Sequence, residues 1–198
     1  MSFAARRWLI TLALVAVAAV WGATFVMVKN AVAGYPLYGF LFWRFAIASV
    51  AFVVLFPKTF RLFRPGTVRV GVLAGLFLTA GYVFQTWGLQ GTSPSKAAFI
   101  TGMFVVITPF LQAVILRRPP AWPAWLGIMA SVVGLWLLSG GAAGGWNSGD
   151  TRVLLCAIAY SAHIIVLGSL GREHDSRPLT FVQLAVCCVL CGAASLVL

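Results

Sequence analysis

Residues 8–32 read WLITLALVAVAAVWGATFVMVKNAV, and the first 21 of them, Trp8–Val28, carry no charge. As a helix, this run would be about as long as the ~30 Å hydrocarbon core of a bilayer is thick. Arg6-Arg7 before it and Ala31-Val32-Ala33 near its end resemble a secretory signal. The apolar core of such a signal is shorter, however, at about 7–15 residues. We therefore interpret the stretch as a retained first membrane-spanning helix.

The composition extends this interpretation to the whole chain. Of its 198 residues, 62% are hydrophobic and 9% are charged, whereas soluble domains carry about 25% charged residues. A soluble fold of this size cannot bury so much apolar surface. The sequence therefore predicts an all-α membrane protein that crosses the bilayer several times.

Glycine- and proline-rich breaks divide the chain into apolar segments of spanning length. Their spacing predicts about seven transmembrane helices in a polytopic bundle, over residues 8–32, 36–56, 68–90, 95–116, 122–140, 152–170 and 178–198. Within the fourth segment, Pro109 is expected to break the backbone ladder.

Basic residues give the orientation, because cytoplasmic loops are enriched in Lys and Arg. With a cytoplasmic N-terminus, three basic residues lie outside, namely Lys29, Lys96 and Arg152, and Arg44 lies within a span. The other ten lie inside: Arg6, Arg7, Lys58, Arg61, Arg64, Arg69, Arg117, Arg118, Arg172 and Arg177. This bias accounts for the net charge of +11 without a nucleic-acid partner, since no basic stretch is interleaved with aromatic residues.

Several kinds of protein are disfavoured by missing motifs. The chain has no G-x-S-x-G, H-E-x-x-H or P-loop lysine, so we expect no enzyme activity. Its cysteines, Cys156, Cys187, Cys188 and Cys191, lack metal-ligand spacing and lie in apolar runs, where they are expected to pack as small apolar residues. No metal or other cofactor is implied.

Small residues are spaced for close packing between helices. Gly71 and Gly75 form a G-x-x-x-G pattern, and Gly127, Ser131 and Gly134 share one face of the fifth segment. Such spacing is typical of helical bundles in general and does not indicate a function.

A weak internal repeat suggests how the segments are organised. Trp21-Gly22-Ala23 aligns with Tyr160-Ser161-Ala162, and after a three-residue insertion Pro36-Leu37 aligns with Pro178-Leu179. Each unit then has five helices, and an odd number inverts the second copy in the membrane. We predict a first repeat over 8–140, a glycine-rich outer linker over 141–151, and part of a second repeat over 152–198, within a protein of ten spans.

Arg44 is the clearest intramembrane polar residue. It lies about 12 Å beyond Pro36 at 1.5 Å per residue, near mid-helix. The three acidic residues, Asp150, Glu173 and Asp175, are predicted to lie in loops. Arg44 can bond backbone carbonyls, meet a group outside the predicted helices, or face a water-filled cavity and an anionic substrate.

Each of the remaining polar candidates can have a structural role or a role in binding substrate. Lys29 and Lys96 fit simple anchors at the outer interface. Polar and aromatic residues on four segments can form interhelical hydrogen bonds or line a common cavity. A single histidine such as His163 is more often a packing residue with its hydrogen bonds satisfied than a functional residue. The candidate residues for a substrate pathway are Trp21, Thr24, Lys29, Arg44, Tyr82, Gln85, Thr101, Tyr160 and His163.

These residues resemble the EamA branch of the drug/metabolite transporter superfamily. The resemblance rests on Trp21-Gly22-x-Thr24-Phe25-x-x-x-Lys29, on Phe42-Trp43-Arg44-Phe45, on TSPSKAAFITGMFVVITPFLQAVILRRP (92–119) and on GIMASVVGLWLL (127–138). It implies ten helices in two inverted repeats around a central cavity. By position, Trp21, Thr24, Tyr82, Thr101 and Tyr160 match places near that cavity, and Lys29 and Arg44 match positions that favour a basic residue.

The resemblance implies transport of small metabolites, such as amino acids or related compounds or drugs, by efflux or exchange. The expected location is the cytoplasmic (inner) membrane, with lipid and a small-molecule substrate as partners. The alternative is a membrane half-module that does not transport, either an assembly partner or a channel-like half that forms a homodimer.

Overall fold

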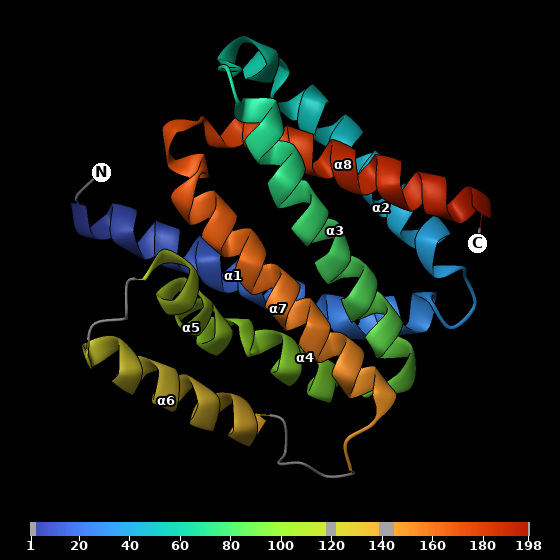
Figure 1. Ribbon diagram of the computed structural model, residues 1–198, viewed down its shortest axis with the longest axis vertical. Coiled ribbons are helices and arrows are strands. Elements are labelled where there is room, and N and C mark those ends of the chain that lie inside the picture. Colours follow the sequence, from blue (N-terminus) through green and yellow to red (C-terminus); the bar gives the residue numbers. More distant parts are fainter. Residues whose placement is uncertain (1–2, 118–121, 139–144, 198) are drawn as a thin grey trace.

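The computed structural model describes residues 3–117, 122–138 and 145–197 (Figure 1). Every regular element in these ranges is a helix, which confirms the predicted all-α fold. The elements are α1 (Phe3–Ala31), α2 (Leu37–Leu55), η1 (Pro57–Leu62), α3 (Thr67–Gly91), α4 (Pro94–Gly102), α5 (Phe104–Leu116), α6 (Trp122–Leu138), α7 (Ser148–Ser169), η2 (Gly171–Glu173) and α8 (Ser176–Val197).

Six of the seven predicted segments are long and apolar enough to cross a membrane. The fourth of these spans, Pro94–Ile115, consists of α4 and α5 together. The fifth predicted segment forms α6, whose apolar part Trp125–Gly134 is shorter than a normal span. Arg118 and residues 141–144 of the predicted linker lie outside the described residues.

Helices α3 and α7 form the centre of the bundle (Figure 1). They run in opposite directions and make the most extensive contact in the molecule. Helix α8 packs against α2 and α3, whereas α1, α4 and α5 pack on the side of α3 and α7 away from α8. Helix α6 contacts only α4 and α5 extensively and lies at the periphery.

Glycines allow α3 to approach α8 closely, as the G-x-x-x-G pattern predicts. A Cβ atom on Gly71 would lie 2.7 Å from Val182 Cβ, and one on Gly75 would lie 2.8 Å from Val186 Cβ. The same expectation is wrong for the fifth segment. A Cβ on Gly127 or Gly134 meets nothing within 4 Å, because α6 lies at the edge of the bundle.

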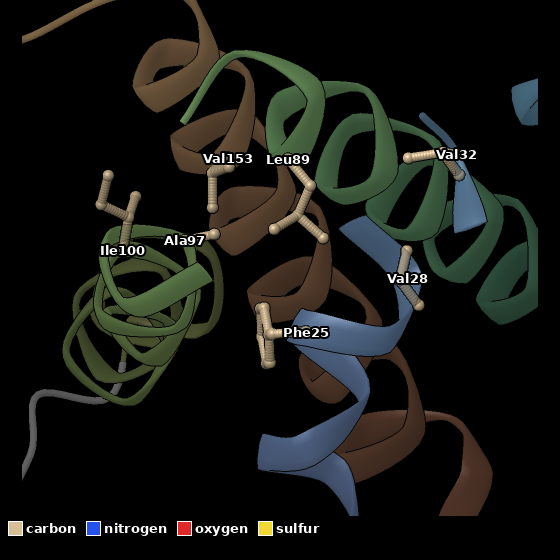
Figure 2. Close-up of a cluster of buried hydrophobic side chains, with 7 residues drawn as sticks. All are labelled: Phe25, Val28, Val32, Leu89, Ala97, Ile100 and Val153. Atoms are coloured by element: carbon tan, nitrogen blue, oxygen red, sulfur yellow. The ribbon is translucent and has the colours of Figure 1, made fainter. Parts of the chain in front are cut away.

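Two apolar clusters hold the helices together. Figure 2 shows the first, in which α1, α3, α4 and α7 contribute Phe25, Val28, Val32, Leu89, Ala97, Ile100 and Val153. The second joins α2 to α8 through Leu41, Phe45, Cys187 and Cys191. Burial of the cysteines in this contact is in line with their predicted packing role.

Much apolar surface remains exposed on the outside of the bundle. Trp8 is 69% exposed, Val54 72% and Val114 76%. A membrane protein has lipid to cover such surface, so it carries no cost there.

Candidate functional site

The fourth span is interrupted at Met103, between α4 and α5. The Met103 N–H donates to the Ile100 carbonyl, three residues back, at 3.1 Å. Pro109, which the sequence predicts to break the backbone ladder, lies inside α5, so the missing N–H at this residue does not end the helix. The carbonyl of Phe104, the first residue of α5, accepts hydrogen bonds from Thr108 Oγ1 at 2.6 Å and from Ser161 Oγ of α7 at 3.3 Å. Hydroxyl donors therefore satisfy the backbone beside the break.

A cavity of about 180 Å³ lies beside this break, among α1, α3, α5 and α7. It is lined by Trp21, Leu78, Tyr82, Phe104, Tyr160, His163 and Ile164. Four of the nine predicted pathway residues thus face one space: Trp21, Tyr82, Tyr160 and His163. A larger hollow of about 590 Å³ beside the start of α2 and Ser195 of α8 has no charged lining residue.

The aromatic side chains of the cavity form a continuous row. Ring centroids are 6.3 Å apart for Trp21 and Phe104, 6.5 Å for Phe104 and Tyr160, and 5.8 Å for Tyr160 and Tyr82. Phe45 extends the row behind Tyr82, at 5.0 Å. These separations suit edge-to-face and tilted aromatic contacts. Trp21 and Tyr160, which the predicted repeat aligns with each other, lie at opposite ends of Phe104.

Gly81 makes room for Tyr160. A Cβ atom at residue 81 would lie 2.3 Å from Tyr160 Cε1 and 2.5 Å from its Cδ1. No real Cβ fits there, so the position of the Tyr160 ring depends on glycine in the neighbouring helix. Tyr160 is 7% exposed, and its ring is held by α3 on one side and the aromatic row on the other.

His163 is oriented by the backbone of α3. Its Nδ1 lies 3.0 Å from the carbonyl oxygen of Ala74. A carbonyl only accepts, so Nδ1 carries the proton in this contact. In the neutral ring Nε2 is then an acceptor, on a side chain that lines the cavity.

Arg44 lies behind Tyr82 rather than on the cavity lining. The guanidinium carbon is 4.9 Å from the centroid of the Tyr82 ring, a cation–π distance. The side chain is half-buried. Arg44 is therefore close to the aromatic row but separated from the cavity by one ring.

Four elements meet, at the ends that the sequence predicts to lie outside, in a polar network defined here as Lys29, Thr92, Lys96, Asn147 and Asp150. Lys29 Nζ donates to the Thr92 carbonyl, and the Thr92 hydroxyl donates to Asp150 Oδ1. Lys96 Nζ lies 2.7 Å from Asp150 Oδ2, and the Asn147 and Asp150 side chains form a capping box at the start of α7. Asp150 is fully buried.

This network revises three expectations from the sequence. Asp150 lies in the first turn of α7, not in a loop, because the helix begins at Ser148, earlier than predicted. Lys29 and Lys96 are tied to other elements at the outer end, so neither is a simple interfacial anchor. Arg152, the third predicted outer residue, stacks on Trp87 at 4.0 Å near the same end.

The other predicted pathway residues lie off the cavity lining. Thr24 Oγ1 donates to the Trp21 carbonyl of its own helix at 2.6 Å. Gln85 Nε2 donates to Thr101 Oγ1 at 3.3 Å, and both side chains are buried between α3 and α4. This pair is an interhelical hydrogen bond, the structural alternative considered above.

Three lining residues were not predicted: Leu78, Phe104 and Ile164. Leu78 and Ile164 are ordinary apolar residues, and their sequence context gives no signal. Phe104 follows Gly102-Met103, and broken spans are typical of transporter binding sites. Within the described residues, no group of three or more His, Cys, Asp or Glu could hold a metal ion.

The fold and the cavity define a class, a polytopic helical membrane protein with a small aromatic site between its spans. Residues 8–140 match the model of the EamA-like transporter family. The match covers more than half of the 198 residues, and the chain belongs to this family.

Curated relatives agree with the family. The chain is 33% identical over 178 residues to an uncharacterized transporter of Archaeoglobus fulgidus, covering 90% of this chain and 55% of the relative. It is 32% identical to the S-adenosylmethionine/S-adenosylhomocysteine transporter of Chlamydia trachomatis, covering 90% and 58%, respectively. The corresponding protein of Chlamydia muridarum is 31% identical, with 89% and 59% covered. The chain therefore spans a little under three-fifths of these relatives. No solved structure matches it significantly.

Proposed function

We propose that the chain forms the substrate-handling part of a transporter that moves small metabolites across the cytoplasmic membrane by alternating access. The expected substrates are amino acids or related compounds, or drugs, moved by efflux or exchange. S-adenosylhomocysteine, named for two of the relatives, is itself an amino acid derivative and falls in this class.

The observation that carries the proposal is the aromatic cavity beside a broken span. Tyr160 is about 15 Å along α7 from Asp150 at 1.5 Å per residue, which is near the middle of a ~30 Å hydrocarbon core. A binding site at the midplane, next to a discontinuous helix, is typical of transporters that work by alternating access.

In this proposal the polar network closes the outer side. It joins α1, the α3–α4 turn, α4 and α7 through Lys29, Thr92, Lys96 and Asp150. The opposite end is held by aromatic contacts, Phe60 with Phe181 and Arg177 with Phe56, and by hydrogen bonds. There, Arg64 donates to the Glu173 carbonyl at 3.2 Å, and Thr67 bonds His174 at 2.9 Å. Opening to the outside then requires the network to break while the inner contacts hold.

The test is flux through proteoliposomes that contain the chain. Radiolabelled S-adenosylhomocysteine and a panel of amino acids are loaded, and efflux and exchange are followed. We expect saturable flux that Tyr160→Ala reduces at least about tenfold by removing an aromatic wall. Trp8→Ala serves as the control, because Trp8 is 69% exposed and lines no cavity.

Flux that is absent for every compound, from a monodisperse chain, would contradict transport by this chain on its own. It would favour the half-module that does not transport. Flux that Trp8→Ala and Tyr160→Ala reduce equally would show that the aromatic cavity is not on the pathway.

A further inference from the structure

The positive charge beside the cavity has no acidic partner. The chain contains three acidic residues. Asp150 pairs with Lys96, and this is the one ion pair among residues 3–117, 122–138 and 145–197. Glu173 lies in η2, and Asp175 lies between η2 and α8, where Asp175 Oδ1 accepts from the Arg177 backbone. None of these three acidic side chains therefore lies with Arg44 inside the membrane.

The aromatic lining of the cavity favours a flat aromatic molecule. Trp21, Phe104, Tyr160 and Tyr82 border it as one continuous row. Aromatic walls favour a planar ring, which can stack on them or meet them edge to face. Among the lining residues, His163 offers a hydrogen-bond acceptor through Nε2 in its neutral form.

From these two features together we propose that the cavity binds a flat aromatic or heteroaromatic acid, a ring that carries a carboxylate, and rejects a cation of the same shape. The inference rests on the proposed function and specifies its substrate class. The ring lies against the aromatic row, and the carboxylate meets the field of Arg44 across Tyr82.

An aromatic cavity by itself also attracts cations, so its rings alone do not favour an anion over a cation. Here the Tyr82 ring already holds the Arg44 guanidinium at 4.9 Å. A second positive charge in the cavity would be repelled by Arg44, and in a low-dielectric membrane interior water screens this repulsion poorly. The same field attracts an anion. Arg44 therefore reverses the preference that the rings alone would give.

The experiment measures equilibrium binding to the 198-residue chain in lipid nanodiscs at pH 7. The probes are indole-3-acetate, tryptamine and cyclohexylacetate: an aromatic anion, an aromatic cation and a non-aromatic anion of similar size. We expect indole-3-acetate to bind at least about tenfold more tightly than either of the others, given an unscreened charge and a stacking ring. Equal or tighter binding of tryptamine, or no binding of either indole, would overturn the proposal.

Variants assign the preference to Arg44. Arg44→Gln should reduce the preference for indole-3-acetate over tryptamine to about threefold or less, and Arg44→Lys, which keeps the charge, should retain most of it. Arg152→Gln is the matched control, because Arg152 also stacks on an aromatic ring, Trp87, but at the outer end. An unchanged preference in Arg44→Gln would overturn the role of Arg44. If that variant does not fold, Arg44→Lys and the three probes on the unmodified chain still decide.

Binding and flux separate this inference from the proposed function. Indole-3-acetate that binds with the expected preference but is not carried through proteoliposomes supports the site and contradicts transport. Tryptamine that is carried in preference to indole-3-acetate supports transport and contradicts the substrate class.

Discussion

At the scale of single residues, Gly81 and Tyr160 are the most tightly coupled pair at the cavity. A Cβ on residue 81 would overlap the Tyr160 ring, with its closest atom at 2.3 Å. We predict that Gly81→Ala destabilises the protein by about 1–3 kcal/mol through overpacking and weakens binding by tilting the ring. Reversible unfolding in mixed micelles measures the first effect.

The matched control is Gly168→Ala in α7, where a Cβ meets nothing within 4 Å. That change should be neutral or slightly stabilising, because alanine favours a helix over glycine by up to about 1 kcal/mol. In the double variant Gly81→Ala/Tyr160→Ala the cost of the extra methyl should largely disappear. A cost that stays the same without the Tyr160 ring would contradict this account.

His163 gives a second prediction, about its tautomer. The Ala74 carbonyl fixes the proton on Nδ1. Asparagine places an amide donor near Nδ1, whereas glutamine places it near Nε2. We therefore expect His163→Asn to keep most of the stability and His163→Gln to lose the bond to α3, at a cost of about 0.6–2 kcal/mol for a hydrogen bond inside a membrane protein. Chemical shifts of ¹⁵N-labelled histidine check the tautomer directly, and a proton on Nε2 would refute it.

The sequence predicted these residues unevenly, for a physical reason. Intramembrane polar and aromatic residues stand out because lipid offers them no partner, and Trp21, Tyr82, Tyr160 and His163 do line one cavity. Periodicity shows which residues share a face of a helix, but not which neighbour that face meets. Gln85 and Thr101 therefore looked equally suitable, yet they bond to each other.

At the scale of elements, the polar network at the outer end depends on a buried carboxylate. Asp150 accepts from Lys96, from Thr92 and from the Asn147 backbone N–H. We predict that Asp150→Asn destabilises the fold by about 2 kcal/mol. This is below the ~3–5 kcal/mol typical of breaking a fully buried pair, because Lys96 is 19% exposed and an asparagine oxygen at 150 can still accept from the Asn147 backbone N–H.

Hydrogen exchange is the measurement for this variant. Exchange should accelerate in the first turns of α7 and at the α3–α4 turn, and much less at η2. Glu173→Gln is the control, because Glu173 bonds Arg64 through its backbone carbonyl and not through its carboxylate. Faster exchange at both ends of the bundle would show that the change loosens the whole fold, not the outer network.

The elements themselves were largely predictable, and their details were not. Apolar length alone located the spans. The predicted first residue of a helix is wrong where a capping residue sets it. Helix α7 is one case, because its N-cap Asn147 lies before the start of the apolar run. The fourth span is interrupted at Met103, between α4 and α5, whereas α5 continues through Pro109. The hydroxyls of Thr108 and Ser161 bond the Phe104 carbonyl beside the interruption.

At the scale of the whole molecule, α1 and α7 run in opposite directions through the bundle. Lys29 at the end of α1 bonds Thr92, and Thr92 bonds Asp150 at the start of α7. The end of one helix and the beginning of the other therefore lie together. That is the relation an inverted repeat requires of its two first helices, and it agrees with the basic residues, which place both ends outside.

This relation predicts which side of the membrane each end faces. In a variant without native cysteines, Asn30→Cys at the end of α1 and Ser148→Cys at the start of α7 should both react with an impermeant maleimide added to intact cells. Lys58→Cys in η1 should react only after permeabilisation. All three positions are exposed, so protection reports the membrane and not burial. Labelling at 30 but not 148 would contradict the inverted arrangement. Labelling at 58 alone would show that the orientation is the reverse of the predicted one. The polar network would then lie on the cytoplasmic side and close that side.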